Sequence, residues 1–152
     1  MNVPGETTGT DTQAVTHFDV LIVGAGISGI DAAYHLQRDC PGKSFALLEN
    51  QASFGGTWVT HKYPGIRSDS DLFTFGYAWK PWVGPPIASA EEILSYLDEV
   101  LDEHDIRRHI RYRRQVKRAI WSSAENLWTL EVANFDSDEV QRLSCNFLWM
   151  CQ

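Results

Sequence analysis

The first clear pattern along the chain is a short apolar run followed by a helical repeat and a second apolar run. Residues 18–23 form the first run, which is typical of a strand buried on both faces of a parallel sheet. Residues 27–37 have helical periodicity, and small residues in this stretch allow close packing on a sheet. A second strand is expected at 44–48. Strand, helix and strand within about 30 residues predict a βαβ unit.

No period holds between residues 50 and 88. This stretch carries eight of the eighteen aromatic residues and several Gly and Pro pairs. A long irregular stretch in a compact domain is usually functional or disordered, and so many aromatic residues do not suit disorder. The segment is therefore predicted to be an ordered loop system wrapped on a ligand.

Helical and then alternating patterns follow this irregular segment. Ser89 and Glu92 form a predicted capping box, and the apolar positions that follow form the stripe of an amphipathic helix. Period-2 alternation at 110–120, 128–132 and 140–145 then predicts a three-stranded antiparallel meander. A last apolar run suits a buried parallel strand that rejoins the first sheet; it is Phe147-Leu148-Trp149-Met150.

Composition and charge narrow the class of protein. A length of 152 residues predicts one domain, and the net charge of −7 argues against general nucleic-acid binding. Seven of the thirteen Lys and Arg residues lie between Arg107 and Arg118. This cluster reads as a nucleic-acid patch or as a solvated strand face, and we favour the strand face because the cluster is short and strand-like.

Cysteine use and the N-terminal stretch bear on location. Three cysteines without a C-x-x-C spacing predict reduced thiols and a cytoplasmic protein. Residues 1–16 lack the features of a signal peptide and are predicted to be a disordered leader, which leaves 17–152 as the domain. No apolar window is long enough to span a bilayer. The five histidines show no metal-binding spacing, so no metal site is predicted.

The chemistry of the chain begins at a glycine motif. Gly24, Gly26 and Gly29 follow the first apolar run, and Glu49 closes the second, twenty residues after Gly29. This is the dinucleotide-binding fingerprint, in which glycines let the backbone approach a pyrophosphate at a helix N-terminus. A glycine turn that serves packing alone is the alternative. The strand before the motif, the helix after it and the acidic residue favour a dinucleotide site.

The acidic residue also discriminates between cofactors. A carboxylate at Glu49 accepts hydrogen bonds from a free ribose hydroxyl pair and repels a 2′-phosphate, so this site suits FAD or NAD and not NADP. The next motif, Phe54-Gly55-Gly56-Thr57-Trp58, adds a second close backbone approach and favours FAD. Taken alone, Gly55-Gly56 could equally form a simple turn.

Together these motifs resemble those of a known family. The stretch 23–29, Glu49, the stretch 55–58 and Tyr63-Pro64-Gly65-Ile66-Arg67-Ser68-Asp69-Ser70-Asp71 look like class B flavoprotein monooxygenases. The Baeyer–Villiger type is most similar, in the subgroup that includes the ethionamide-activating mycobacterial enzyme. The resemblance runs over about 18–151. It implies an α/β fold, a partial doubly wound, Rossmann-like FAD-binding domain with an antiparallel meander.

The resemblance also implies an activity and its reactants. Such enzymes use FAD, NADPH and O2 to insert oxygen beside a ketone or onto a sulfide or amine. The partners expected for this chain are therefore small molecules of these classes. No nucleic-acid partner and no transmembrane segment are expected.

Site residues carried over from the family fall along the whole cofactor. Asp69 would lie near the isoalloxazine as a catalytic residue, where it could orient a cation that stabilises anionic oxygen; a turn-capping aspartate is its alternative. Arg67 and Ser68 would lie near the nicotinamide half of NADPH, although Arg67 could also be a structural ion-pair partner. The cofactor-binding set is Gly24, Gly26, Ser28, Gly29, Glu49, Gly56, Thr57, Trp58, Arg67, Ser68, Asp69 and Val116, with Val116 meeting the adenine through its backbone.

Other family features do not occur in these 152 residues. They include the F-x-G-x-x-x-H-x-x-x-W fingerprint and the second G-x-G-x-x-G, which serves NADPH. We therefore expect an N-terminal fragment of a flavin monooxygenase that is catalytically inactive alone. Two alternatives stay open at this point: an FAD-binding module that needs a partner chain, and a non-catalytic remnant.

Overall fold

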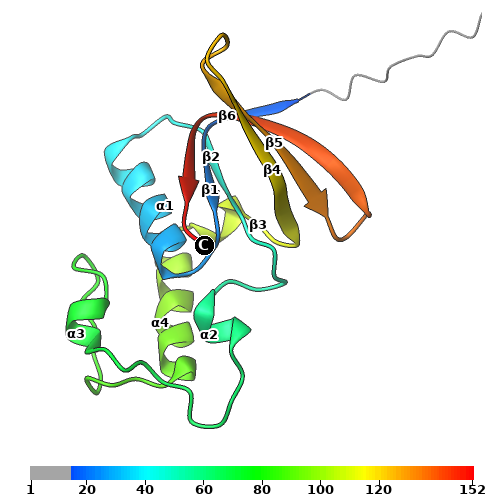
Figure 1. Cartoon of the computed structure of the whole chain (residues 1–152). Helices are drawn as coiled ribbons and strands as arrows, with labels where there is room; N and C mark the ends of the chain where they lie inside the picture. Colours follow the sequence, from blue (N-terminus) through cyan, green and yellow to red (C-terminus); the bar gives the residue numbers. More distant parts are fainter. Residues whose placement is uncertain (1–14) are drawn as a thin grey trace, which may run out of the picture.

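The computed structural model describes residues 15–152, so almost all of the predicted leader lies outside the described residues. The chain forms one six-stranded sheet with helices on one side (Figure 1). The elements are β1 Thr16–Val23, α1 Ile27–Asp39, β2 Phe45–Leu48, α2 Thr57–Thr60, α3 Leu72–Phe75, α4 Ala90–Glu103, the 3-10 turn η1 Arg107–His109, β3 Ile110–Arg111, β4 Arg114–Ser122, β5 Leu127–Asn134 and β6 Glu139–Met150.

The sheet combines a parallel half with an antiparallel half. Its strand order is β3-β2-β1-β6-β5-β4. The pairs among β3, β2, β1 and β6 are parallel, whereas β6-β5 and β5-β4 are antiparallel. The predicted α/β class, a partial doubly wound, Rossmann-like domain, is therefore confirmed, and the antiparallel half corresponds to the predicted meander.

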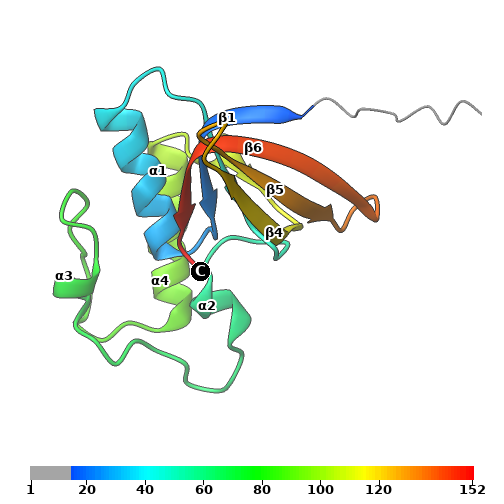
Figure 2. The same ribbon diagram turned by 45° about the horizontal axis from the view of Figure 1, so that its top comes forward.

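Both faces of β1 and β2 are covered, which explains the continuous apolar sequence of these two strands. In β1, Val20 and Ile22 join the cluster that includes Ile30 of α1 and Leu97 of α4. Leu21, between them, faces the other way, and its cluster is filled from the meander by Leu130, Val132 and Leu143. Figure 2 shows the meander on the side of the sheet away from α1 and α4. The meander thus takes the place of a second helical layer.

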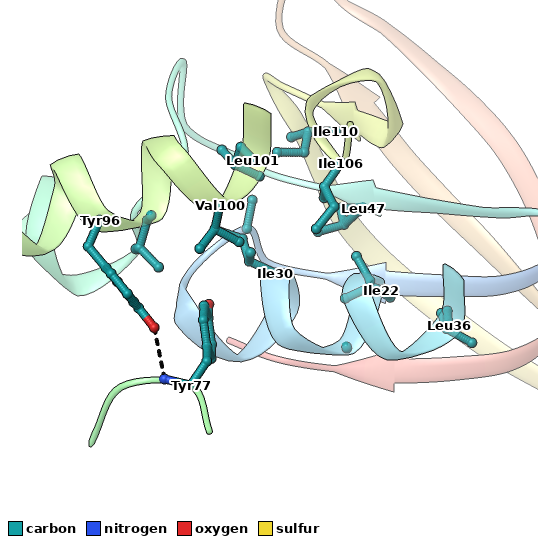
Figure 3. Close-up of a cluster of buried hydrophobic side chains, with 14 of the residues drawn as sticks. Ile22, Ile30, Leu36, Leu47, Tyr77, Tyr96, Val100, Leu101, Ile106 and Ile110 are labelled. Carbon is teal, nitrogen blue, oxygen red and sulfur yellow. Dashed lines mark hydrogen bonds between the residues drawn. The ribbon is translucent and has the colours of Figure 1, made fainter. Parts of the chain in front are cut away.

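The amphipathic helix predicted after Ser89 is α4. Both arms of its capping box are present, since the Ser89 side chain accepts from the Glu92 N–H and the Glu92 carboxylate accepts from the Ser89 N–H. Its buried stripe joins residues of α1 and β2 in one apolar cluster, in which Val100 lies beside Ile30 (Figure 3). Confirmation of both cap and stripe shows that local sequence specifies this helix.

The strand boundaries of the meander differ from those predicted. Its expected first strand, 110–120, is divided, because Ile110 and Arg111 pair with β2 in the parallel half and only β4 enters the meander. The division falls at Arg113, whose φ of 54° breaks the extended backbone. The third meander strand and the final parallel strand are one continuous strand, β6. It pairs with β5 through Cys145 and with β1 up to Met150.

The final apolar run is parallel to β1 as predicted, but the prediction that it is buried is wrong. Phe147 is 56% exposed, Trp149 39% and Met150 51%. Periodicity cannot reveal this, because it reports which residues could be buried and not whether another element covers them.

Aromatic residues of the segment 50–88 serve the core more than expected. The Trp79 ring lies between Tyr34 and Tyr77, with ring centroids 3.6 and 4.6 Å away. The Tyr96 hydroxyl accepts from the Tyr77 N–H at 2.9 Å, as Figure 3 shows. Two short helices, α2 and α3, are the only helices of this segment. These contacts fasten the segment to α1 and α4.

A helix that crosses a membrane must be both long and apolar. Within residues 15–152, none of the helices combines the length and apolar character needed to cross a bilayer.

Candidate functional site

The glycine turn lies at the carboxyl end of β1, where β2, β6 and α1 meet. Gly24 has φ 105°, and a Cβ added to it would lie 2.7 Å from the carbonyl oxygen of Cys151. A Cβ on Gly29 would lie 2.0 Å from the carbonyl oxygen of Gly24, inside the distance that any side chain allows. Figure 1 shows the chain end beside the start of α1. Glycine is thus required here for close packing of three segments.

The start of α1 is open to a ligand. Its N-cap, Gly26, has no side-chain cap, and the first turn holds no acidic residue. The first N–H groups of a helix have no partner within the helix and carry partial positive charge. This arrangement suits a phosphate.

Glu49 joins the glycine turn to the loop after β2. The residue is 5% exposed, and its carboxylate accepts hydrogen bonds from the Ala25 N–H and from the Gln51 N–H, both at 2.8 Å. The two oxygens use different donors, so each keeps a lone pair for a further hydrogen bond. Glu49 therefore holds the turn in place while it can still accept from a ribose.

The second glycine pair approaches the first. The Gly55 N–H donates to the Ala25 carbonyl at 2.9 Å. A Cβ on Gly56, whose φ is 53°, would lie 3.1 Å from the Gly26 Cα. The backbones of the two glycine segments therefore touch, with α2 starting directly after this contact.

These segments surround a cavity of about 790 Å³. Ligands of open α/β sheets bind at the carboxyl ends of the strands, and the cavity lies at those ends of β1, β2 and β6. Eight predicted site residues line it: Gly24, Gly26, Ser28, Glu49, Gly56, Thr57, Trp58 and Val116.

Four predicted site residues do not line the cavity. Gly29 is buried beneath the turn. Ser68 is 3% exposed, and its hydroxyl donates to the Ser70 carbonyl while its N–H donates to the Ala88 carbonyl. Arg67 donates to the Gly65 carbonyl, and Asp69 is exposed. The roles assigned to Arg67, Ser68 and Asp69 stay predictions.

Other lining residues were not predicted from the sequence. Asp31 and His35 follow Ile27 at spacings of four and eight, so they lie on the helix face that looks into the cavity. The helical repeat could have indicated them. Arg114, Trp149 and Cys151 reach the cavity only because β4 and β6 return to the first strands, and no local signal indicates that.

Two arginines of the cation-rich stretch are paired with carboxylates. Arg107 bonds to Asp98 and Asp102, and Arg114, which lines the cavity, pairs with Asp136. Burial, followed by the charge of Asp31, raises the pKa of Cys151 at the cavity wall, so this thiol stays protonated near neutral pH. All three cysteines are free thiols.

Comparison with known proteins places this arrangement in a family. A family model described as an NAD(P)-binding Rossmann-like domain matches residues 22–97. The chain belongs to this family. It is also 48% identical over 136 residues to the FAD-containing monooxygenase EthA of Mycobacterium tuberculosis, which covers 89% of this chain and 27% of that protein. The chain therefore spans about a quarter of the length of such curated relatives.

Solved structures agree with this lineage. A steroid monooxygenase in its oxidised form with bound NADP superposes with a TM-score of 0.80 at 31% identity, covering 90% of this chain and 26% of that one. A complex of OTEMO with FAD and NADP gives a TM-score of 0.74 at 28% identity, covering 88% and 25%. The resemblance to flavin-dependent monooxygenases of the Baeyer–Villiger type is confirmed.

Proposed function

We propose that this chain forms the FAD-binding part of an NADPH- and O2-dependent flavin monooxygenase that oxygenates a ketone, sulfide or amine. The observation that carries the proposal is the cavity in which the glycine turn, Glu49, the second glycine pair and Val116 converge. Relatives whose names state that they contain FAD support the choice of cofactor. The unpaired thiols support the cytoplasmic location predicted from the sequence.

The residues present fit FAD in three ways. Where Gly26 meets Gly56, a Cβ would fill the space that a close backbone approach needs. The open start of α1 offers N–H groups to the pyrophosphate, and Glu49 keeps lone pairs for the adenosine ribose. At the other end, Thr57 and Trp58 offer a hydroxyl and an aromatic face on the flavin side.

When bound, FAD would accept hydride from NADPH and activate O2. In this chain the cavity walls would hold the cofactor, and Trp58 would shield its flavin end from water. Asp69 would act near the isoalloxazine, and Arg67 and Ser68 would lie near the nicotinamide half of NADPH. We propose further that the 152 residues bind FAD but do not oxidise NADPH by themselves.

Purification of the 152-residue chain, followed by titration with FAD and detection of flavin fluorescence, tests the proposal. We expect saturable binding of one FAD and no ketone-dependent consumption of NADPH. A chain that takes up no flavin would refute the binding proposal. Ketone-dependent NADPH oxidation by these residues alone would refute the inactivity proposal.

Glu49→Gln tests the ribose assignment. The amide cannot accept from two backbone N–H groups and two ribose hydroxyls together, so FAD affinity should fall by about tenfold or more, the range expected for hydrogen bonds to a charged group. Glu91→Gln is the matched control, because Glu91 is exposed on α4 and does not line the cavity. Equal FAD dissociation constants for the two variants would contradict the assignment.

A further inference from the structure

Arg114 lines the cavity and is near Glu49 and Val116, the residues assigned to the adenosine. It is the first residue of β4, and Gln115 and Val116 line the cavity with it. Among the described residues that line this cavity, it is the one arginine or lysine. Residues 114, 115 and 116 pair regularly with β5, so the side chains of Arg114 and Val116 leave the strand on the same side.

The backbone around Arg114 is tied to Glu49. The Arg114 N–H donates to the Glu49 carbonyl at 2.8 Å, and the Arg113 N–H donates to the Gln51 carbonyl at 3.0 Å. Because the Glu49 carboxylate in turn accepts from the Gln51 N–H, the strand end and the predicted ribose acceptor form one rigid unit. Arg114 therefore keeps a fixed position relative to Glu49.

The Arg114 guanidinium is held in place through one nitrogen, Nη1. Nη1 donates to the carbonyls of Tyr112 and Arg113 at 3.1 and 3.3 Å and to the Asp136 carboxylate at 3.0 Å. Within residues 15–152, neither Nε nor Nη2 has a hydrogen-bond acceptor. The side chain is 22% exposed. An arginine held at Nη1 loses little further entropy when a planar ligand meets the rest of the group.

We propose that Arg114 is a further cofactor-contacting residue, whose guanidinium packs against the adenine ring of the bound dinucleotide. The inference rests on the proposed function, because it takes the cavity to hold FAD. A guanidinium plane stacks well on an aromatic base, and a lysine ammonium has no such plane. Glu49 and Arg114 would then recognise the ribose and the base of one nucleotide from a single rigid unit.

The experiment measures dissociation constants of FAD and of ADP for the wild-type chain, Arg114→Gln, Arg114→Lys and Arg113→Gln. Arg113 is the matched control, since it pairs with the same Asp136 but does not line the cavity. We expect Arg114→Gln to weaken both ligands about tenfold, as for loss of one cation–π stack. Arg114→Lys should show most of the affinity loss of Arg114→Gln, because an ammonium group has no plane that can stack. The dissociation constants of Arg113→Gln should stay within about twofold of the wild-type values. Urea unfolding of each variant checks that the fold persists.

Any of three results would overturn the inference. They are an unchanged ADP affinity in Arg114→Gln, a wild-type affinity in Arg114→Lys, and a loss of affinity in Arg113→Gln equal to that in Arg114→Gln. If the wild-type chain binds ADP but does not bind FAD, the proposed function is refuted. The effect of the Arg114 substitutions on ADP affinity then decides the role of Arg114. A wild-type chain that binds neither ligand would overturn both.

Discussion

The glycine at the end of β1 offers a quantitative test of how the site is built. Gly24→Ala places a Cβ at a φ of 105° and 2.7 Å from the Cys151 carbonyl oxygen, where ordinary contacts begin near 3.4 Å. Gly42→Ala is a matched control, because its φ is 91° and nothing lies within 4 Å of the added Cβ. The two substitutions share backbone strain and differ in overlap.

The expected magnitudes follow from these two contributions. Left-handed strain costs about 1–2 kcal/mol, and this is the whole expected loss of unfolding free energy for Gly42→Ala. Gly24→Ala adds overpacking of about 1–3 kcal/mol, for a total of roughly 2–5 kcal/mol. The overlapping oxygen belongs to backbone whose N–H is bonded to the Val23 carbonyl at 2.9 Å, so it cannot rotate away as a side chain would.

Urea unfolding followed by tryptophan fluorescence measures both variants, and FAD titration measures the site. Gly24→Ala should lose more stability than Gly42→Ala and should also lose FAD affinity, because β6 must shift at the cavity wall. Gly42→Ala should keep its FAD affinity. Equal stability of the two variants would show that the close approach of β1 and β6 does not require glycine, and the reasoning would fail.

Two further predictions concern the core and pH. Trp79→Leu should cost about 2–4 kcal/mol of unfolding free energy, because it removes the stack between two tyrosine rings and leaves Asp31 without its 2.8 Å indole donor; thermal or urea unfolding measures it, and a loss below about 1 kcal/mol would contradict this role. Burial, followed by the charge of Arg108, lowers the pKa of His109 below 6.5, where its ring stacks on Phe45. The unfolded state therefore binds a proton at His109 more readily than the folded state does. The stability that the neutral, buried ring contributes is complete above pH 6.5 and is lost as the pH falls below it. The urea midpoint of His109→Phe should fall less on acidification than that of wild type, and equal slopes would refute the assignment.

Local sequence determined the elements with strong signals. The βαβ unit, the capping box at Ser89 and the glycine fingerprint depend on residues within a few turns of one another, so each could be recognised without the fold. Eight of the twelve predicted cofactor residues line one cavity for the same reason: they belong to motifs whose spacing fixes their place at strand ends.

Only the tertiary structure decided the features that depend on contacts between segments far apart in the sequence. The division between β3 and β4, the continuity of β6 and the exposure of Phe147 follow from pairing between strands far apart in sequence. The entry of Arg114 into the cavity has the same origin, because the meander carries it back to Glu49. Hydrophobic period specifies which face of an element is apolar, whereas only the packed chain specifies what covers that face.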